Sequence, residues 1–209
     1  MRIKICGITS AQDALTSIDA GADALGFNFF PPSPRSLSIQ SAAPWIQTLP
    51  PFISLTAILV NPTHEQITTI EKYLPFDLWQ LHGHESPHFC RALHPRRVIK
   101  AVAIHSASEI SSTLDYPVTA LLIDTPSSQY GGTGKKGDWT LARELVQKSP
   151  LPVILSGGLT PDNVAEAIAT VRPFGIDVCS GVESSPGKKD PAKLRDFILA
   201  AREAAAKLT

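Results

Sequence analysis

The chain has 209 residues, of which 43% are hydrophobic, and its 19 basic side chains balance its 19 acidic ones. This length and apolar content fit one domain with a sizeable core, covering residues 1–209. A net charge of zero provides no basic surface, so we expect neither nucleic acid nor an anionic membrane as a partner. Any anionic ligand must be bound by local groups, such as backbone N–H groups and single cations.

The sequence favours a cytoplasmic location. Its N-terminus becomes polar too soon for the apolar region of a signal peptide, and its best apolar run, residues 52–60, is too short to span a bilayer. Its three cysteines lie far apart and are odd in number, which argues against a disulfide framework and fits a reducing compartment.

Short apolar runs alternate with amphipathic stretches along the whole chain. The apolar runs predict eight strands, at residues 3–6, 24–28, 54–60, 78–81, 98–101, 120–124, 153–156 and 175–178. The amphipathic stretches predict a helix after each strand, at residues 11–20, 39–48, 64–73, 87–94, 107–114, 140–148, 161–171 and 191–207.

Capping residues mark several of these helix starts. Ser10 begins a capping-box pattern, and Ser86, Thr160 and Asp190 each stand before a proline that suits the first helical position. Gly21 is placed to end the first helix.

Eight strand–helix units in one chain predict an α/β fold, the closed (β/α)8 TIM barrel. A doubly wound open sheet shows the same alternation, but it has fewer strands as a rule and a G-x-G-x-x-G turn after its first strand. The turn at residues 6–9, CGIT, lacks that spacing. The barrel is therefore favoured.

Two reactive side chains stand at predicted strand ends, where a barrel has its active-site face. Cys6 precedes Gly7, and Asp124 follows an apolar run. A thiol and a carboxylate can act as base and acid. The alternative for Cys6 is a small buried hydrophobe, which is what we expect Cys90 and Cys179 to be. For Asp124 the alternative is a helix-cap or turn aspartate.

Glycines follow the last two predicted strands. Gly157 and Gly158 precede a helix, and Ser180 and Gly181 stand where a short extra helix could begin. These two loops often form a phosphate site in a barrel, so we expect all four residues to bind phosphate, although turn formation alone could account for them. A third cluster, residues 131–135, lacks the P-loop spacing and is read as a loop over the mouth.

A metal site is not expected. Two histidines flank Gly83, and His88 and Cys90 follow, but no ligand pair stands at a spacing typical of metal sites. We expect His84 and His88 to be exposed to solvent.

Five motifs in order resemble the phosphoribosylanthranilate isomerase family: KICGIT at 4–9, QLHG at 80–83, GTGK at 132–135 with DW at 138–139, SGGL at 156–159 and DVCSGVE at 177–183. The resemblance runs from residue 3 to about residue 183, and the ordered set is specific although no single motif decides it. Cys179 stands where the family more often has serine.

The resemblance implies a step of tryptophan biosynthesis, the Amadori rearrangement of N-(5-phosphoribosyl)anthranilate to 1-(2-carboxyphenylamino)-1-deoxyribulose 5-phosphate. It implies no metal and no organic cofactor. In that chemistry Asp124 would be the acid at the ring oxygen, holding its proton near neutral pH until transfer. Cys6 would be the base at C2, for which we expect a lowered pKa because the thiolate accepts the proton.

The resemblance also implies that Arg35 holds the anthranilate ring and carboxylate, by stacking and bidentate hydrogen bonding. The alternative is a solvated loop arginine. Gln80 and His82 are expected to line the substrate pocket. Asp177 ends the eighth strand without an assigned role.

Other readings stay open from the sequence. A pentose-phosphate epimerase or a thiamine-phosphate synthase would share the phosphate-binding barrel, and a barrel that binds a phosphosugar without turnover is a third. The cysteine–aspartate pair favours the isomerase. A monomer and a homodimer are both compatible with the sequence.

Overall fold

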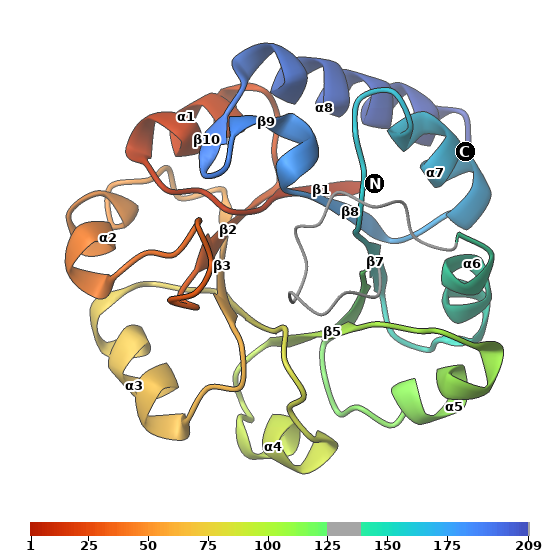
Figure 1. The fold of residues 1–209 in the computed structure, drawn as a ribbon, viewed down its shortest axis with the longest axis horizontal. Helices are drawn as coiled ribbons and strands as arrows, with labels where there is room; N and C mark the ends of the chain where they lie inside the picture. The colour runs from red at the N-terminus through yellow and green to blue at the C-terminus, as the bar shows by residue number, and fades with distance from the viewer. Residues whose placement is uncertain (125–138, 209) are drawn as a thin grey trace.

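The computed structural model describes residues 1–124 and 139–208. Its strands close into a parallel barrel in sequence order, ringed by helices (Figure 1), which confirms the predicted (β/α)8 fold. The barrel strands are β1 (Arg2–Ile5), β2 (Ala24–Asn28), β3 (Ser54–Leu59), β4 (Leu78–Leu81), β5 (Val98–Val102), β6 (Ala120–Ile123), β7 (Val153–Leu155) and β8 (Gly175–Val178).

The helices follow the strands around the outside. They are α1 (Ala11–Asp19), α2 (Ile39–Ile46), α3 (His64–Tyr73), α4 (Pro87–Ala92), α5 (Ile110–Thr113) with a preceding 3-10 turn η1 (Ala107–Glu109), α6 (Trp139–Lys148), α7 (Val164–Val171) and α8 (Pro191–Ala206). After β8 come a 3-10 turn, η2 (Ser180–Val182), and a hairpin of β9 (Glu183–Ser185) and β10 (Lys188–Lys189).

Side-chain alternation along the strands builds two apolar layers. Ile3 and Ile5 of β1 are fully buried in the large core between strands and helices, because successive residues of a strand face opposite sides. The lumen contains a smaller cluster around Ile99, Ala101 and Leu122. Lys4, between Ile3 and Ile5, therefore faces the lumen.

Most of the predicted boundaries lie within two residues of the observed ones, and three features differ. The helix predicted over 161–171 begins at Val164, because Asn163 is its N-cap and the Thr160–Pro161 segment forms a turn before it. The helix predicted over 107–114 is a 3-10 turn followed by a single short helix. The β9–β10 hairpin was not predicted, since its polar strands lack an apolar run.

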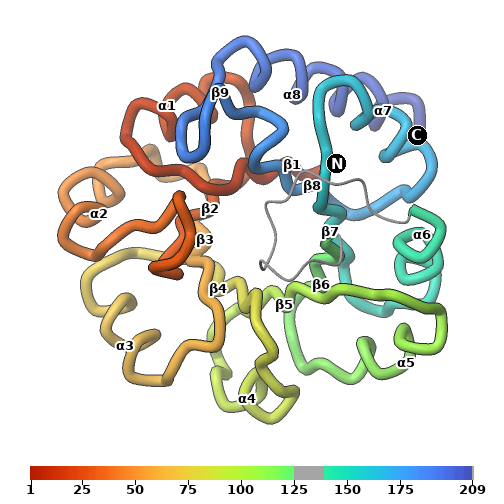
Figure 2. Tube along the Cα trace, viewed as in Figure 1, coloured from red at the N-terminus to blue at the C-terminus, as the bar shows by residue number. Residues whose placement is uncertain are grey.

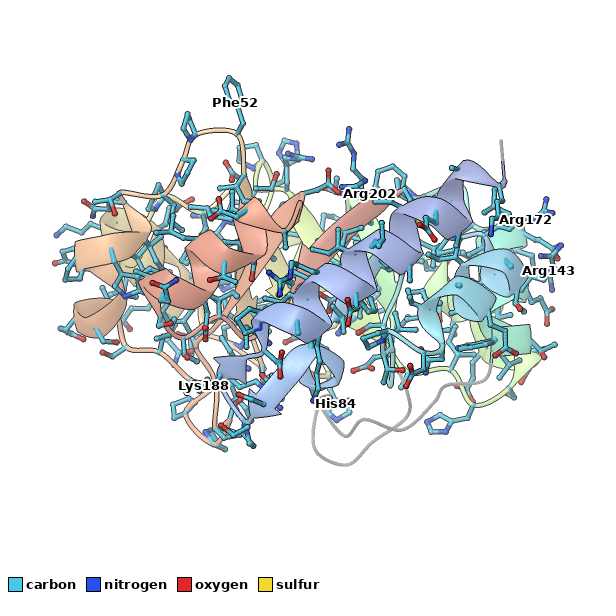
Figure 3. All side chains as sticks on the ribbon, turned by 90° about the horizontal axis from the view of Figure 1, so that it is seen from above. Phe52, His84, Arg143, Arg172, Lys188 and Arg202 are labelled. Atoms are coloured by element: carbon cyan, nitrogen blue, oxygen red, sulfur yellow. The ribbon has the colours of Figure 1, made fainter. Side chains whose placement is uncertain are left out.

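The two faces of the barrel are distinguished in the side view of Figure 3. Phe52, which precedes β3 and is fully exposed, projects from one face. His84, which follows β4, and Lys188 of the hairpin lie toward the opposite face, where the carboxyl ends of the strands meet. No helix within residues 1–124 and 139–208 is long and apolar enough to cross a membrane.

Candidate active site

A cavity of about 610 Å³ opens at the carboxyl ends of the strands. Its lining combines a thiol pair, two carboxylates, a histidine and an arginine with the proline-rich segment after β2. The lining residues are Cys6, Gly7, Asn28, Phe30, Pro32, Ser33, Pro34, Arg35, Ile58, Val60, His82, Asp124, Ser156, Asp177, Cys179 and Pro186. Cys6 and Asp124 therefore share one cavity, as predicted from their positions at strand ends.

Cys6 lies directly beside Cys179 at the junction of the first and last strands. The register pairs Ile5 with Val178, and the Cys6 N–H donates to the Val178 carbonyl at 2.8 Å. Gly7 has a φ of +72°, and a Cβ there would lie 2.8 Å from the Cys179 sulfur. Cys179 thus lines the cavity, which corrects the expectation of an inert core thiol.

The thiol pair reverses the expected direction for Cys6. A side-chain hydrogen bond with Cys179 and burial raise the pKa of Cys6 well above its ordinary value, and attraction by Lys4 only partly opposes them. The pKa of Cys179 is lowered by the same hydrogen bond and by the positive charges of Lys189 and Arg35. The raised pKa of Cys6 runs opposite to the lowered pKa expected from the sequence and favours the protonated thiol.

Asp124 is held by a chain of hydrogen bonds from β4. His82 Nε2 lies 3.2 Å from Asp124 Oδ2, and Gln80 Nε2 lies 3.0 Å from His82 Nδ1. With the Gln80 amide donating to Nδ1, the imidazole carries a proton on Nε2 and donates it to Asp124 Oδ2. Gln80 is fully buried beneath His82, so it does not line the cavity as expected. Its position makes it a support for His82.

A buried ion pair forms the floor of the cavity. Lys4 Nζ donates to Asp177 Oδ1 at 2.7 Å, and both side chains are at most 5% exposed. Ser156 Oγ donates to the other Asp177 oxygen at 3.3 Å. The pair places a cation below Cys6, and burial and attraction act in opposite senses on Lys4, whose pKa is raised overall.

Arg35 enters from the segment after β2 and is held by Glu183 of the hairpin. Its Nε donates to Glu183 Oε1 at 2.9 Å and its Nη2 donates to Oε2 at 2.7 Å. Lys189 Nζ donates to Glu183 Oε1 at 3.0 Å. Sequence reasoning placed Glu183 in a motif but missed both Glu183 and Lys189 as site residues, because nothing in the local pattern marks a contact between residues 148 positions apart.

The glycine loops after β7 and β8 meet in a small cavity beside the large one. Gly157, Gly158, Ser180 and Gly181 all line it, and it shares Asp124, Ser156, Asp177 and Cys179 with the large cavity. Gly157 and Gly158 have φ of +87° and +64°, a conformation that favours glycine. A side chain at Gly181 would collide with the Leu159 carbonyl. The four predicted phosphate residues are thus brought together.

Asn163 fastens the first of these loops. Its Nδ2 donates to the Gly158 carbonyl at 2.9 Å, and its Oδ1 accepts from the Thr160 N–H at 2.9 Å. The N-cap side chain of α7 therefore bonds the loop in place of its own helix.

The other titratable residues singled out from the sequence lie away from this cavity. His84 and His88 are exposed, and Cys90 is buried in α4. In the described part of the chain no group of three or more His, Cys, Asp and Glu side chains could hold a metal ion. Residues 131–135 and the rest of the segment 125–138 lie outside the described residues.

The model of the N-(5'phosphoribosyl)anthranilate (PRA) isomerase family matches residues 3–200. The chain belongs to this family. It is therefore an isomerase of tryptophan biosynthesis, as the resemblance implied. The N-(5'-phosphoribosyl)anthranilate isomerase of Trichlorobacter lovleyi is 47% identical over 205 residues, which cover 98% of this chain and 99% of that protein. The namesake from Geobacter sulfurreducens is 47% identical over 203 residues, covering 97% and 98%.

Solved structures of PRA isomerases share the barrel. The phosphoribosyl anthranilate isomerase of Thermotoga maritima has a TM-score of 0.90 at 42% identity, and the match covers 97% of this chain and 99% of that one. A PRA isomerase in complex with reduced 1-(o-carboxyphenylamino)-1-deoxyribulose 5-phosphate has a TM-score of 0.87 at 39% identity, with the same coverage.

Proposed function

We propose that this PRA isomerase converts N-(5-phosphoribosyl)anthranilate to 1-(2-carboxyphenylamino)-1-deoxyribulose 5-phosphate, with Asp124 as general acid and Cys6 as general base. The observation that carries the proposal is the order of groups in the joined cavities. Arg35 and Cys6 line the large cavity, the glycine loops line the small one, and Asp124 lines both. A ligand with an aromatic carboxylate and a phosphate at its two ends matches that order.

The phosphate end rests on Gly157, Gly158, Ser180 and Gly181. In the described residues their backbone N–H groups donate no hydrogen bond, so they are available to an anion. Arg35 suits the anthranilate end, because its guanidinium can stack on a ring and its Nη1, which makes no hydrogen bond within residues 1–124 and 139–208, can donate to a carboxylate. A substrate bound at these two ends would have its ribose beside Cys6 and Asp124.

Catalysis begins with ring opening. Asp124 gives its proton to the furanose oxygen as the C1–O bond breaks, and the anthranilate nitrogen supplies the electron pair that forms the cationic Schiff base. His82 donates a hydrogen bond to the carboxylate that results, and Gln80 keeps His82 in the donating tautomer.

Cys6 then removes the C2 proton, and the electrons of the C–H bond neutralise the Schiff base to give an enolamine, which tautomerises to the ketone. Because the pKa of Cys6 is raised, the Cys6 thiol has to lose its own proton before it can accept the one from C2, and the hydrogen-bonded Cys179, whose pKa is lowered, can take that proton as a thiolate. The positive charge of the Schiff base next to C2 adds to that of Lys4 and favours the thiolate when substrate is present.

The test is turnover of freshly made phosphoribosylanthranilate without added metal, followed by the loss of anthranilate fluorescence. Cys6→Ala and Asp124→Asn should each remove most of the activity, at least about a hundredfold, while the circular dichroism spectrum stays unchanged. Absence of turnover by the folded wild-type chain contradicts the proposed reaction. Near-full activity of either variant contradicts the role of that residue.

Two predictions from the sequence remain to be tested alongside it. A solved relative from Thermotoga maritima is described as a monomer generated from a dimeric isomerase, with 38% identity and a TM-score of 0.87. Light scattering of this chain decides between the monomer and the homodimer. The three free cysteines agree with the expected cytoplasmic location, which localisation of a tagged chain tests.

A further inference from the structure

Arg35, which lines the large cavity, forms an ion pair with Glu183, and the buried Glu183 forms a second ion pair with the buried Lys189. The Glu183 carboxylate accepts hydrogen bonds from both Nε and Nη2 of Arg35. The side chain of Glu183 is 4% exposed and that of Arg35 is 12% exposed. A bidentate contact of this kind fixes the plane of the guanidinium as well as its distance from the carboxylate. The remaining nitrogen, Nη1, makes no hydrogen bond within residues 1–124 and 139–208, and Arg35 lines the large cavity.

Lys189 contacts the same carboxylate, at the oxygen that also accepts from Arg35 Nε. Its side chain is fully buried, and its Nζ donates to Glu183 Oε1 at 3.0 Å and to the Cys179 carbonyl at 3.2 Å. The hairpin that carries both residues is attached to the barrel, since the Lys189 N–H donates to Asp13 of α1 at 3.2 Å. In Figure 1 the hairpin lies beside α1.

The net charge of Arg35, Glu183 and Lys189 determines how strongly the cluster attracts an anion. Arg35 and Glu183 alone would form a pair with no net charge, which attracts a carboxylate weakly. Lys189 brings the cluster to a net charge of +1 and competes with Arg35 for the negative charge of Glu183. The pKa of Glu183 is accordingly held below its ordinary value: burial opposes ionisation, and Arg35 and Lys189 outweigh it.

We propose that Glu183 and Lys189 are positioning residues for recognition of the substrate carboxylate. Glu183 fixes the orientation of Arg35, and Lys189 offsets the charge of Glu183 so that Arg35 keeps its attraction for the anion. The inference rests on the proposed placement of the anthranilate carboxylate at Arg35. It adds a role for the unpredicted hairpin, whose turn residue Pro186 also lines the large cavity.

The discriminating probe is a pair of ligands that differ only in the carboxylate. One is reduced 1-(o-carboxyphenylamino)-1-deoxyribulose 5-phosphate, and the other is the same molecule without the ring carboxyl group. Titration calorimetry gives the ratio of their dissociation constants. For the wild-type chain this ratio should favour the carboxylate by at least about tenfold.

Lys189→Met removes the buried cation and leaves a similar volume. It should weaken binding of the carboxylate ligand by about tenfold and leave that of the other ligand unchanged. Lys188→Met is the matched control, because Lys188 is the exposed neighbour in the same strand and carries the same charge. It should change neither constant. In turnover, Lys189→Met should raise KM while kcat stays within about twofold.

Glu183→Gln separates orientation from charge. It raises the net charge of the cluster to +2, so a purely electrostatic role predicts tighter binding of the carboxylate ligand, whereas the positioning role predicts weaker binding. Glu183→Gln combined with Lys189→Met removes any unpaired buried lysine and covers the case in which the single variant fails to fold. The double variant should still lose carboxylate discrimination, because the two-pronged contact with Arg35 is gone.

The outcomes separate this inference from the proposed function. If the wild-type chain binds both ligands equally, the placement of the carboxylate at Arg35 is wrong. If the wild-type chain discriminates and Lys189→Met discriminates equally well, the placement holds and the role of Lys189 is wrong. Weakened binding of both ligands by the same factor would show a purely structural role for the hairpin and would also overturn the inference.

Discussion

At the scale of single residues, the chemistry of Cys6 is set by its neighbour across the first and last strands. Cys179 contributes the largest cause of the raised Cys6 pKa, through the hydrogen bond between the two side chains. A hydroxyl or methyl side chain at residue 179 could not ionise in the same range. This chain therefore couples its proposed base to a second titrating group.

Replacement of Cys179 tests that coupling. In Cys179→Ala the hydrogen bond and the negative charge that raise the pKa of Cys6 are both gone, so that pKa falls and the thiolate fraction at a given pH rises. Iodoacetamide should then alkylate Cys6 several times faster at a pH of about 8, measured by peptide mass spectrometry. Cys90→Ala, in α4, serves as the control. An unchanged or slower rate for Cys179→Ala would refute the coupling.

At the scale of elements, the loop between β7 and α7 is shaped by a helix cap that serves the site. The sequence predicted that Thr160 caps a helix beginning at Pro161, yet the helix begins three residues later. The intervening turn lets Asn163 bond both the Gly158 carbonyl and the Thr160 N–H. The shift of the helix start thus lets Asn163 hold the end of the glycine loop at the Gly158 carbonyl.

Asn163→Ala should loosen this loop. The two lost hydrogen bonds should raise KM about five-fold, with kcat little changed, because we propose that the loop binds the phosphate, the end of the substrate that does not react. Steady-state kinetics measures both constants. Asp162→Ala alters the exposed neighbour and should behave as wild type. A fall in kcat with unchanged KM would rule out a role of Asn163 in phosphate binding.

At the scale of the whole molecule, closure of the barrel joins the ends of the chain. Strand β1 pairs with β8 along four residues, and α8 passes beside both α1 and α7 (Figure 2). Lys4 and Asp177 face each other across this closure, 173 residues apart in sequence. Breaking one partner of a buried pair leaves an uncompensated charge, so the closure should be sensitive to it.

Lys4→Met should lower the free energy of unfolding by about 3 kcal/mol, because Asp177 would stay buried without its cation. Arg2→Met is a control on the same strand. Its ion pair with Asp23 has an arginine side chain that is 70% exposed, and the loss should stay below about 1 kcal/mol. Urea unfolding followed by circular dichroism measures both changes. Equal losses of unfolding free energy in the two variants would show that the buried ion pair stabilises the fold no more than the exposed one.

The sequence by itself determined the barrel, most of its boundaries and the family. Apolar runs, turn residues and caps such as Ser86 and Asp190 are local signals, and each acts within a few residues of where it stands in the chain. Cys6 and Asp124 could be assigned to one face because parallel strands all end on the same side. Gly157, Gly158 and Gly181 could be assigned to the same face, because they follow the last two strands of the barrel.

The tertiary structure alone decided how these residues are paired. The contacts of Arg35 with Glu183 and of Cys6 with Cys179 join segments far apart in the chain, and no local pattern encodes which side chains meet. The burial of Gln80 behind His82 and the raised pKa of Cys6 likewise depend on which side chains the fold packs together. The electrostatic character of a buried group depends on everything packed around it, so it exists only once the barrel has closed.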